Sequence, residues 1–132
     1  MDARGSFEVT LTPRVPDDPA DGTSVGRLTI AKQFHGDLDA TSTGQMLAVN
    51  TDVEGSAGYV AMEQVTGTLH GRSGTFALQH SGTMTRGIPQ LSVTVVSDSG
   101  TGQLAGLAGT MTIEIIEGEH LYALTYTLSD AL

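Results

Sequence analysis

The sequence YVAMEQVTGTLHGRSGTFALQHSG, residues 59–82, carries the strongest structural signal in this chain. Two runs in which apolar and polar side chains alternate flank a glycine-rich segment between Gly67 and Gly74. Alternation with a period of two is typical of half-buried strands, and clustered glycines mark a turn. The stretch therefore predicts a β-hairpin. The glycine pattern recurs from Gly102 to Gly109, which predicts that the same hairpin corner is used twice.

Similar alternation continues on both sides of this hairpin. Short glycine-, proline- and aspartate-containing turns separate the runs, and no long segment has the period of a helix. Sequential antiparallel strands can close into a barrel, which removes exposed edges, and an eight-stranded barrel is either filled by side chains or holds one small ligand. We therefore predict an all-β fold, an eight-stranded antiparallel β-barrel with little or no helix, and keep a two-sheet sandwich as the alternative. The six further strands are expected at 7–12, 24–35, 41–50, 91–96, 109–116 and 120–128.

The domain organisation is expected to be simple. A chain of 132 residues suits one domain, here a single β-barrel over residues 1–132. The segment 13–22 contains three prolines and three aspartates, a composition that forms neither a ladder nor a core. We expect a flexible surface loop there.

Charge and composition exclude several classes of function. Fifteen acidic and six basic residues give a net charge of -9, which opposes binding to nucleic acid or to an anionic membrane. The absence of cysteine excludes disulfides and thiol chemistry. No secretory signal or membrane-spanning run is visible, so we expect a soluble cytoplasmic protein. Whether it forms a homodimer is left open.

Ionisable side chains on the apolar faces of the predicted strands are the candidate site. A charged group that points into an apolar lumen must pair, contact water or shift its pKa. Lys32, Glu63 and His80 each share a strand face with large apolar side chains. The full set of candidate ligand-binding residues is Lys32, Tyr59, Phe76, His120, Tyr122 and Tyr126.

Two interpretations of this face stay open. In the functional one, Glu63 and His80 are catalytic: burial raises the pKa of Glu63 so that it abstracts a proton, and the imidazole returns one, as an isomerase or cyclase requires. In the structural one, Glu63 forms a buried ion pair with Lys32, and His80 and the tyrosines bond to the backbone.

Other chemistry finds little support in the sequence. His35 and His70 lie on polar faces or in turns and are expected to be solvated. No pair of histidines has the spacing of a metal site, so we expect no metal, and nothing calls for another cofactor. The glycine-rich turn at Gly100–Gly102 precedes a strand, so it lacks the helix dipole of a phosphate site.

Several stretches resemble a known family. GYVAME (58–63), GRSGTFALQHSG (71–82), SGTGQLAGLAGTM (99–111) and HLYALTY (120–126) are similar to the bacterial domain-of-unknown-function family numbered 3224. Members of that family resemble the allene oxide cyclase barrels, and the stretch from Gly100 to Gly109 is also similar to one in plant dirigent proteins. The resemblance implies an eight-stranded antiparallel barrel with a lumen, and it brings no assigned activity.

Three functions follow as alternatives. The preferred one is a barrel that binds a small, largely apolar or amphipathic molecule in its lumen. The second is a cofactor-independent cyclase or isomerase that uses Glu63 and His80. The third is a structural, oligomerising barrel with a filled core and an exposed apolar patch on the outer face, for instance around Met46, Met62 and Met84.

Overall fold

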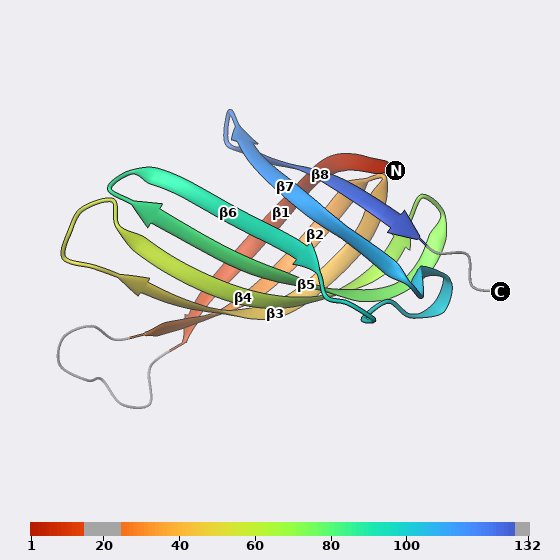
Figure 1. Cartoon of the computed structure of the whole chain (residues 1–132), viewed down its shortest axis with the longest axis horizontal. Helices are drawn as coiled ribbons and strands as arrows, with labels where there is room; N and C mark the ends of the chain where they lie inside the picture. The colour runs from red at the N-terminus through yellow and green to blue at the C-terminus, as the bar shows by residue number, and fades with distance from the viewer. Residues whose placement is uncertain (15–24, 129–132) are drawn as a thin grey trace.

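The computed structural model describes residues 1–14 and 25–128. They form a closed antiparallel barrel in which eight strands follow one another in chain order, as predicted (Figure 1). One 3-10 turn, η1 (Gly102–Leu104), precedes β7. The described residues contain no helix long and apolar enough to cross a membrane. The strands are β1 (Asp2–Arg14), β2 (Gly26–Gly36), β3 (Leu38–Asn50), β4 (Ala57–Leu69), β5 (Arg72–Thr85), β6 (Ile88–Val95), β7 (Leu107–Ile116) and β8 (Glu119–Leu128).

The first strand is longer than the expected 7–12. Its early part, Asp2 to Phe7, pairs with β8. This pairing joins residues far apart in the sequence, and no local alternation of apolar and polar side chains predicts it. Its late part continues through Pro13, which lies opposite Leu28. From Glu8 onward β1 pairs only with β2 among the described residues, so Pro13 lies on an edge, where proline is tolerated. Of the predicted loop 13–22, residues 15–22 lie outside the described residues.

Three hairpins turn through two-residue loops with positive φ at both positions, the type I′ geometry. Glycine takes the second position in each because it adopts positive φ without strain. The hairpin expected from residues 59–82 is therefore confirmed, with a turn of only His70 and Gly71. Gly67 and Gly74 pair with each other inside the ladder. The other two turns are Arg86–Gly87 and Glu117–Gly118.

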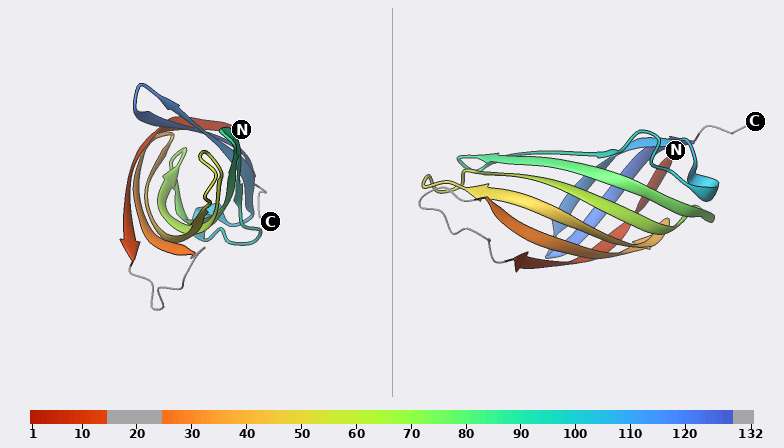
Figure 2. Two further views of the ribbon diagram at one scale, coloured as in Figure 1. Left: turned by 90° about the vertical axis from the view of Figure 1, so that its left-hand side faces the viewer. Right: turned by 90° about the horizontal axis from the view of Figure 1, so that it is seen from below.

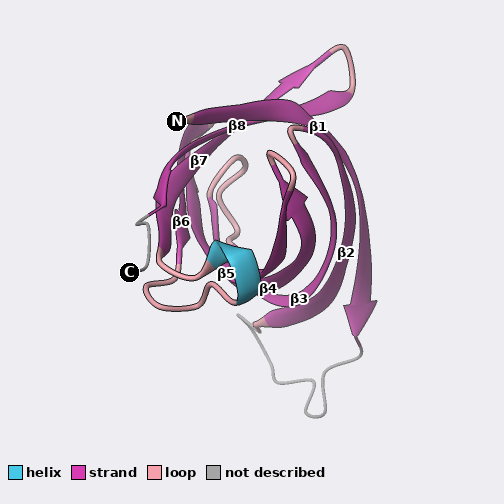
Figure 3. Ribbon diagram, turned by 90° about the vertical axis from the view of Figure 1, so that its right-hand side faces the viewer, coloured by secondary structure: helices cyan, strands magenta, loops and turns pink. Residues whose placement is uncertain are grey.

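The second glycine pattern does not form another hairpin corner, and that prediction is wrong. Instead, the chain before β7 runs along the start of β5, where the amide of Thr101 donates to the carbonyl of Thr75 at 2.8 Å. A Cβ on Gly74 would clash with the carbonyl oxygen of Thr101, so this glycine permits the close approach. The turn η1 lies across this end of the barrel (Figure 3), and its Leu104 is 1% exposed.

Barrel closure is weakest between β6 and β7. Only two residue pairs join these strands, Val93 with Met111 and Thr94 with Thr110. Beyond them the β7–β8 hairpin diverges from the β5–β6 hairpin (Figure 1). The inward-facing Leu91 is consequently 44% exposed.

The inner face divides into a packed half and an open half. In the packed half, at the end closed by η1, large apolar side chains are fully buried, among them Phe34, Phe76 and Leu124. In the open half, inward-facing side chains remain accessible: Leu11 is 44% and Met84 39% exposed. Figure 2 looks into this open end. The structure thus combines a filled core with an accessible inner face.

The contribution of η1 is testable by substitution of Leu104. Leu104→Ala removes a buried side chain that seals the packed half, and we expect the free energy of unfolding to fall by about 2 to 5 kcal/mol in urea denaturation. The control is Ala105→Ser at the exposed neighbouring position, expected to change it by about 0.5 kcal/mol or less. Equal stability of Leu104→Ala and wild type would show that η1 does not seal the barrel.

Candidate functional site

Four inward-facing side chains from four consecutive strands meet at the boundary between the two halves. Lys32 lies on β2, Ser42 on β3, Glu63 on β4 and His80 on β5, and we refer to them as the charged cluster. Register brings them together, because Lys32 lies opposite Ser42, and Glu63 and His80 lie two positions apart across the β4–β5 ladder. The inner-face neighbours on the closed side, such as Phe34 and Leu78, belong to the packed half.

Glu63 is the centre of the cluster and its side chain is fully buried. Oε2 accepts hydrogen bonds from Lys32 Nζ at 3.0 Å and from His80 Nε2 at 2.7 Å. Oε1 accepts one from the Ser42 hydroxyl at 2.6 Å. The Lys32 ammonium also lies 4.7 Å from the ring centroid of Phe7, a cation–π contact. Glu63 thus contacts at once Lys32, its partner in the structural interpretation, and His80, its partner in the functional one.

The ionisation of Glu63 differs from the expectation. Burial raises the pKa of its carboxyl, but the hydrogen bond from His80, the Lys32 ammonium and the hydrogen bond from Ser42 outweigh burial and hold the pKa below its ordinary value. Glu63 is therefore a carboxylate at neutral pH, and a weak base. The predicted proton abstraction by a Glu63 of raised pKa does not fit this environment.

Hydrogen bonding to Glu63 determines the tautomer of His80. A carboxylate only accepts hydrogen bonds, so Nε2 of His80 must carry a proton. In the neutral imidazole Nδ1 is then an acceptor. Within residues 1–14 and 25–128, Nδ1 has no hydrogen-bond partner, and no buried side-chain nitrogen or oxygen there is left unpaired. Nδ1 is thus not sealed off, and a bound molecule can reach it.

Tyr59 lies next to the cluster on the open side. It is half-buried and its ring covers the Cα of Gly82, its partner on β5. Burial and the nearby Glu63 carboxylate raise the pKa of Tyr59, so its phenol stays protonated and can donate a hydrogen bond. Tyr59 and His80 are diagonal neighbours on the inner face, a relationship in which Cβ atoms lie about 7–8 Å apart.

The remaining candidate residues contact the protein itself. Tyr122 is buried, and its hydroxyl accepts a hydrogen bond from the amide of Leu38 at 2.9 Å. Phe76 and Tyr126 are also buried, and Tyr126 bonds to His70. Burial raises the pKa of both tyrosines. Half-buried His120 packs on the ring of Phe7 with centroids 5.1 Å apart, so the structure does not bring these four into the charged cluster.

Sequence reasoning missed two polar contacts. Ser42 bonds to Glu63, and its only signal was a hydroxyl on the face that also carries Ala40 and Met46. His70 is exposed, as expected, but its Nδ1 also bonds to Tyr126 and its Nε2 lies 3.6 Å from Asp37. Both depend on pairing between distant strands and turns. His35 is exposed, as expected, and pairs with Glu8.

The predicted methionine patch is wrong in part. Met46 and Met84 share the inner face with Ser42 and His80, and only Met62 faces outward, 50% exposed. The outer face of β3 and β4 carries exposed Leu47 and Val60 beside it. Homodimer formation stays a prediction.

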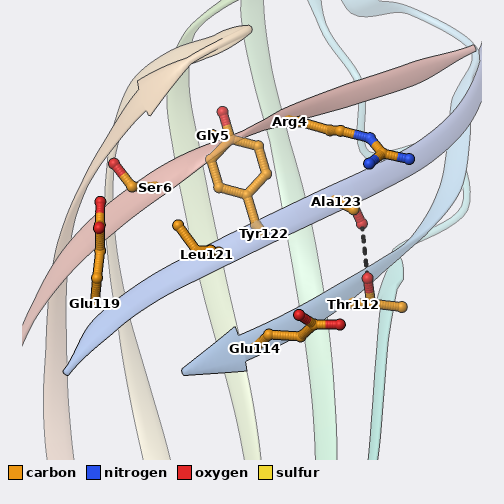
Figure 4. A pocket seen from close by; sticks show the side chains of 9 residues that line it. All are labelled: Arg4, Gly5, Ser6, Thr112, Glu114, Glu119, Leu121, Tyr122 and Ala123. Atoms are coloured by element: carbon orange, nitrogen blue, oxygen red, sulfur yellow. Dashed lines mark hydrogen bonds between the residues drawn. The ribbon is translucent and has the colours of Figure 1, made fainter. Parts of the chain in front are cut away.

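A separate depression lies outside the barrel, over β1, β7 and β8 (Figure 4). The ionisable side chains Arg4, Glu114 and Glu119 are exposed, and of the predicted site residues it touches only Tyr122. Exposed, freely solvated charges are typical of an ordinary surface. Residues 1–14 and 25–128 contain no group of three histidine or carboxylate side chains arranged to hold a metal.

Fold and site together define a small antiparallel β-barrel protein with a charged cluster buried in its interior. The family model described as "Protein of unknown function (DUF3224)" matches residues 3–126, and the chain belongs to this family. A crystal structure of a DUF3224 protein of unknown function from Shewanella oneidensis MR-1 is 46% identical, with a TM-score of 0.93 over 99% of this chain and 98% of that one. Comparison with curated proteins finds no match. The similarity to allene oxide cyclase barrels stays a prediction.

The lowered pKa of Glu63 predicts a pH-dependent contribution to stability. A carboxyl whose pKa is depressed by folding stabilises the native state above its ordinary value of 4.5, and this contribution is lost as pH falls through the folded-state pKa. We expect Glu63→Gln to be less stable than wild type at neutral pH, with the gap narrowing on acidification below 4.5 in urea denaturation. The control Glu8→Gln removes an exposed carboxylate that also pairs with a histidine, and its curve is expected to follow wild type. Parallel curves for Glu63→Gln and wild type would contradict the pKa assignment.

Proposed function

We propose that this protein binds a small, largely apolar molecule in the open half of its barrel. The observation that carries the proposal is the exposure of apolar side chains on the inner face: Leu11, Met84 and Leu91. Inward-facing apolar residues at the packed end are sealed, so the accessible ones are not a general property of this barrel. Ligand sites are mostly apolar with a few polar groups that fix orientation.

The charged cluster supplies the polar groups of this proposed site. It lies at the inner limit of the open half, with Nδ1 of His80 as an acceptor and the Tyr59 hydroxyl as a donor. Glu63 holds the imidazole in place, Lys32 and Ser42 hold Glu63, and these three do not themselves need to touch the ligand. The proposed ligand therefore has an apolar body and one polar end.

Acid–base isomerisation or cyclisation is a second candidate, favoured by the 2.7 Å contact between Glu63 and His80. A carboxylate that orients an imidazole and stabilises its protonated form is a recurring device of proton transfer. In this mechanism His80 takes the proton and Glu63 positions the imidazole. The sequence predicts that Glu63 takes the proton, so the roles are reversed. Its signature would be exchange of the α-protons of a bound ketone with solvent deuterium, lost in His80→Gln.

Binding is testable with the neutral fluorophore N-phenyl-1-naphthylamine, whose emission rises in apolar surroundings. Ala48 faces inward beside Tyr59 in the open half, so Ala48→Trp fills the proposed site. We expect wild type to enhance the emission and Ala48→Trp to weaken binding by at least about tenfold, equivalent to about 1.4 kcal/mol.

The matched control is Leu47→Trp, one residue earlier on the exposed outer face. It adds the same indole without entering the lumen, so it is expected to bind like wild type. Melting temperatures of both variants report whether they fold. Equal binding by the two variants, or no binding by wild type, would refute the proposed location.

A further inference from the structure

We propose that the ligand of the open half is an apolar carboxylic acid, bound as its anion while His80 takes up one proton. This inference rests on the proposed function and specifies the chemistry of its ligand. It starts from an imbalance in the number of basic and acidic side chains of the charged cluster: Lys32 and His80 are basic, and Glu63 is acidic. A ligand carboxylate completes two pairs of opposite charges.

The imbalance matters because the cluster is buried. The side chains of Lys32, Glu63 and His80 are 7%, 0% and 5% exposed, and buried charge is costly unless it is paired. The carboxylate of Glu63 and the ammonium of Lys32 already balance each other. A neutral His80 fits this state, whereas an imidazolium adds a positive charge that needs a second anion.

Nδ1 of His80 is placed to bind such an anion. Nε2 of His80 donates to Glu63, so the second proton of an imidazolium resides on Nδ1. There it donates to one oxygen of the ligand carboxylate. The proton comes from solvent when the free acid is ionised, and no other bond forms or breaks. The protonated hydroxyl of Tyr59 is a second donor on the same side.

The apolar side chains of the open half suit the rest of such a molecule. Beyond the cluster the inner face carries Leu28, Met46 and Met84, which are apolar and partly accessible. A hydrocarbon chain lies along these side chains, with its carboxylate inward at His80. The cost of burying that carboxylate is offset by the imidazolium it faces.

Several titratable groups surround His80 and enter its pH dependence. Glu63 and Tyr59 lie on β4, and Lys32 of β2 is linked to His80 because both bond to Glu63. The β6 residue opposite it is the apolar Val93. On β8, His120 packs on Phe7, the ring under the Lys32 ammonium.

The test is calorimetric titration of the full chain with octanoate and, separately, with octan-1-ol. Near pH 7.5 the heat of octanoate binding is measured in phosphate and in Tris, whose ionisation enthalpies differ, and the difference gives the number of protons taken up. We expect uptake approaching one proton per octanoate, and an affinity that falls as pH rises because binding takes up a proton. Octan-1-ol is expected to bind without proton uptake. A salt concentration of about 0.15 M, where the screening length is about 8 Å, reduces repulsion of the anion by the net charge of -9.

Two variants test whether His80 is the group that takes up the proton. His80→Gln keeps a donor for Glu63 but does not titrate, so octanoate binding is expected to weaken at least about tenfold and to lose proton uptake. The control His35→Gln removes a histidine that also pairs with a carboxylate, Glu8, on the exposed outer face. This variant is expected to keep the octanoate affinity and the proton uptake of wild type. The measurement on wild type stands whether or not His80→Gln folds.

The outcomes separate the two proposals. Binding of octan-1-ol, with octanoate bound without proton uptake or not at all, overturns this inference and leaves the proposed function standing. Failure of both compounds and of the fluorophore overturns the proposed function and this inference together. Proton uptake that persists in His80→Gln also overturns the inference, because another group then takes the proton.

Discussion

Burial of the Glu63 carboxylate is the constraint on which the interior of this barrel depends. A carboxylate without solvent contact is tolerated only when hydrogen bonds and an opposite charge replace water. Lys32, Ser42 and His80 do this from three other strands, so register across β2 to β5 is tied to one side chain. A slip of one residue in any of these strands would turn a partner outward and leave Glu63 unpaired.

The cluster also marks the limit of the packed core. Toward η1 the inner face is filled by aromatic and aliphatic side chains, and Tyr122 and Tyr126 use their hydroxyls for contacts that hold the turns at that end. Toward the other end apolar side chains remain accessible and the β6–β7 junction is short. One barrel thus has a stable half that supports the cluster and an accessible half in which a molecule can reach His80. This division is the basis for both proposals.

Glycines on the neighbouring strands make room for the large and charged side chains of the inner face, because a residue without Cβ lets such a side chain lie across its strand. All three tyrosines have a glycine as cross-strand partner, and Gly44 lies opposite Glu63. A Cβ on Gly44 would clash with the backbone of β4. Pairing of an aromatic residue with glycine is a known way to protect the strand where it curves.

The sequence by itself determined the strands, the hairpin at residues 59–82 and the inward orientation of Lys32, Glu63 and His80, because alternation with a period of two is a local property. Only the tertiary structure decided which of these side chains touch, since that depends on register between strands distant in sequence. For this reason Ser42 and the pairing of His70 with Tyr126 escaped prediction. The lowered pKa of Glu63 escaped prediction for the same reason. Burial alone raises this pKa, and the three partners that lower it come from other strands.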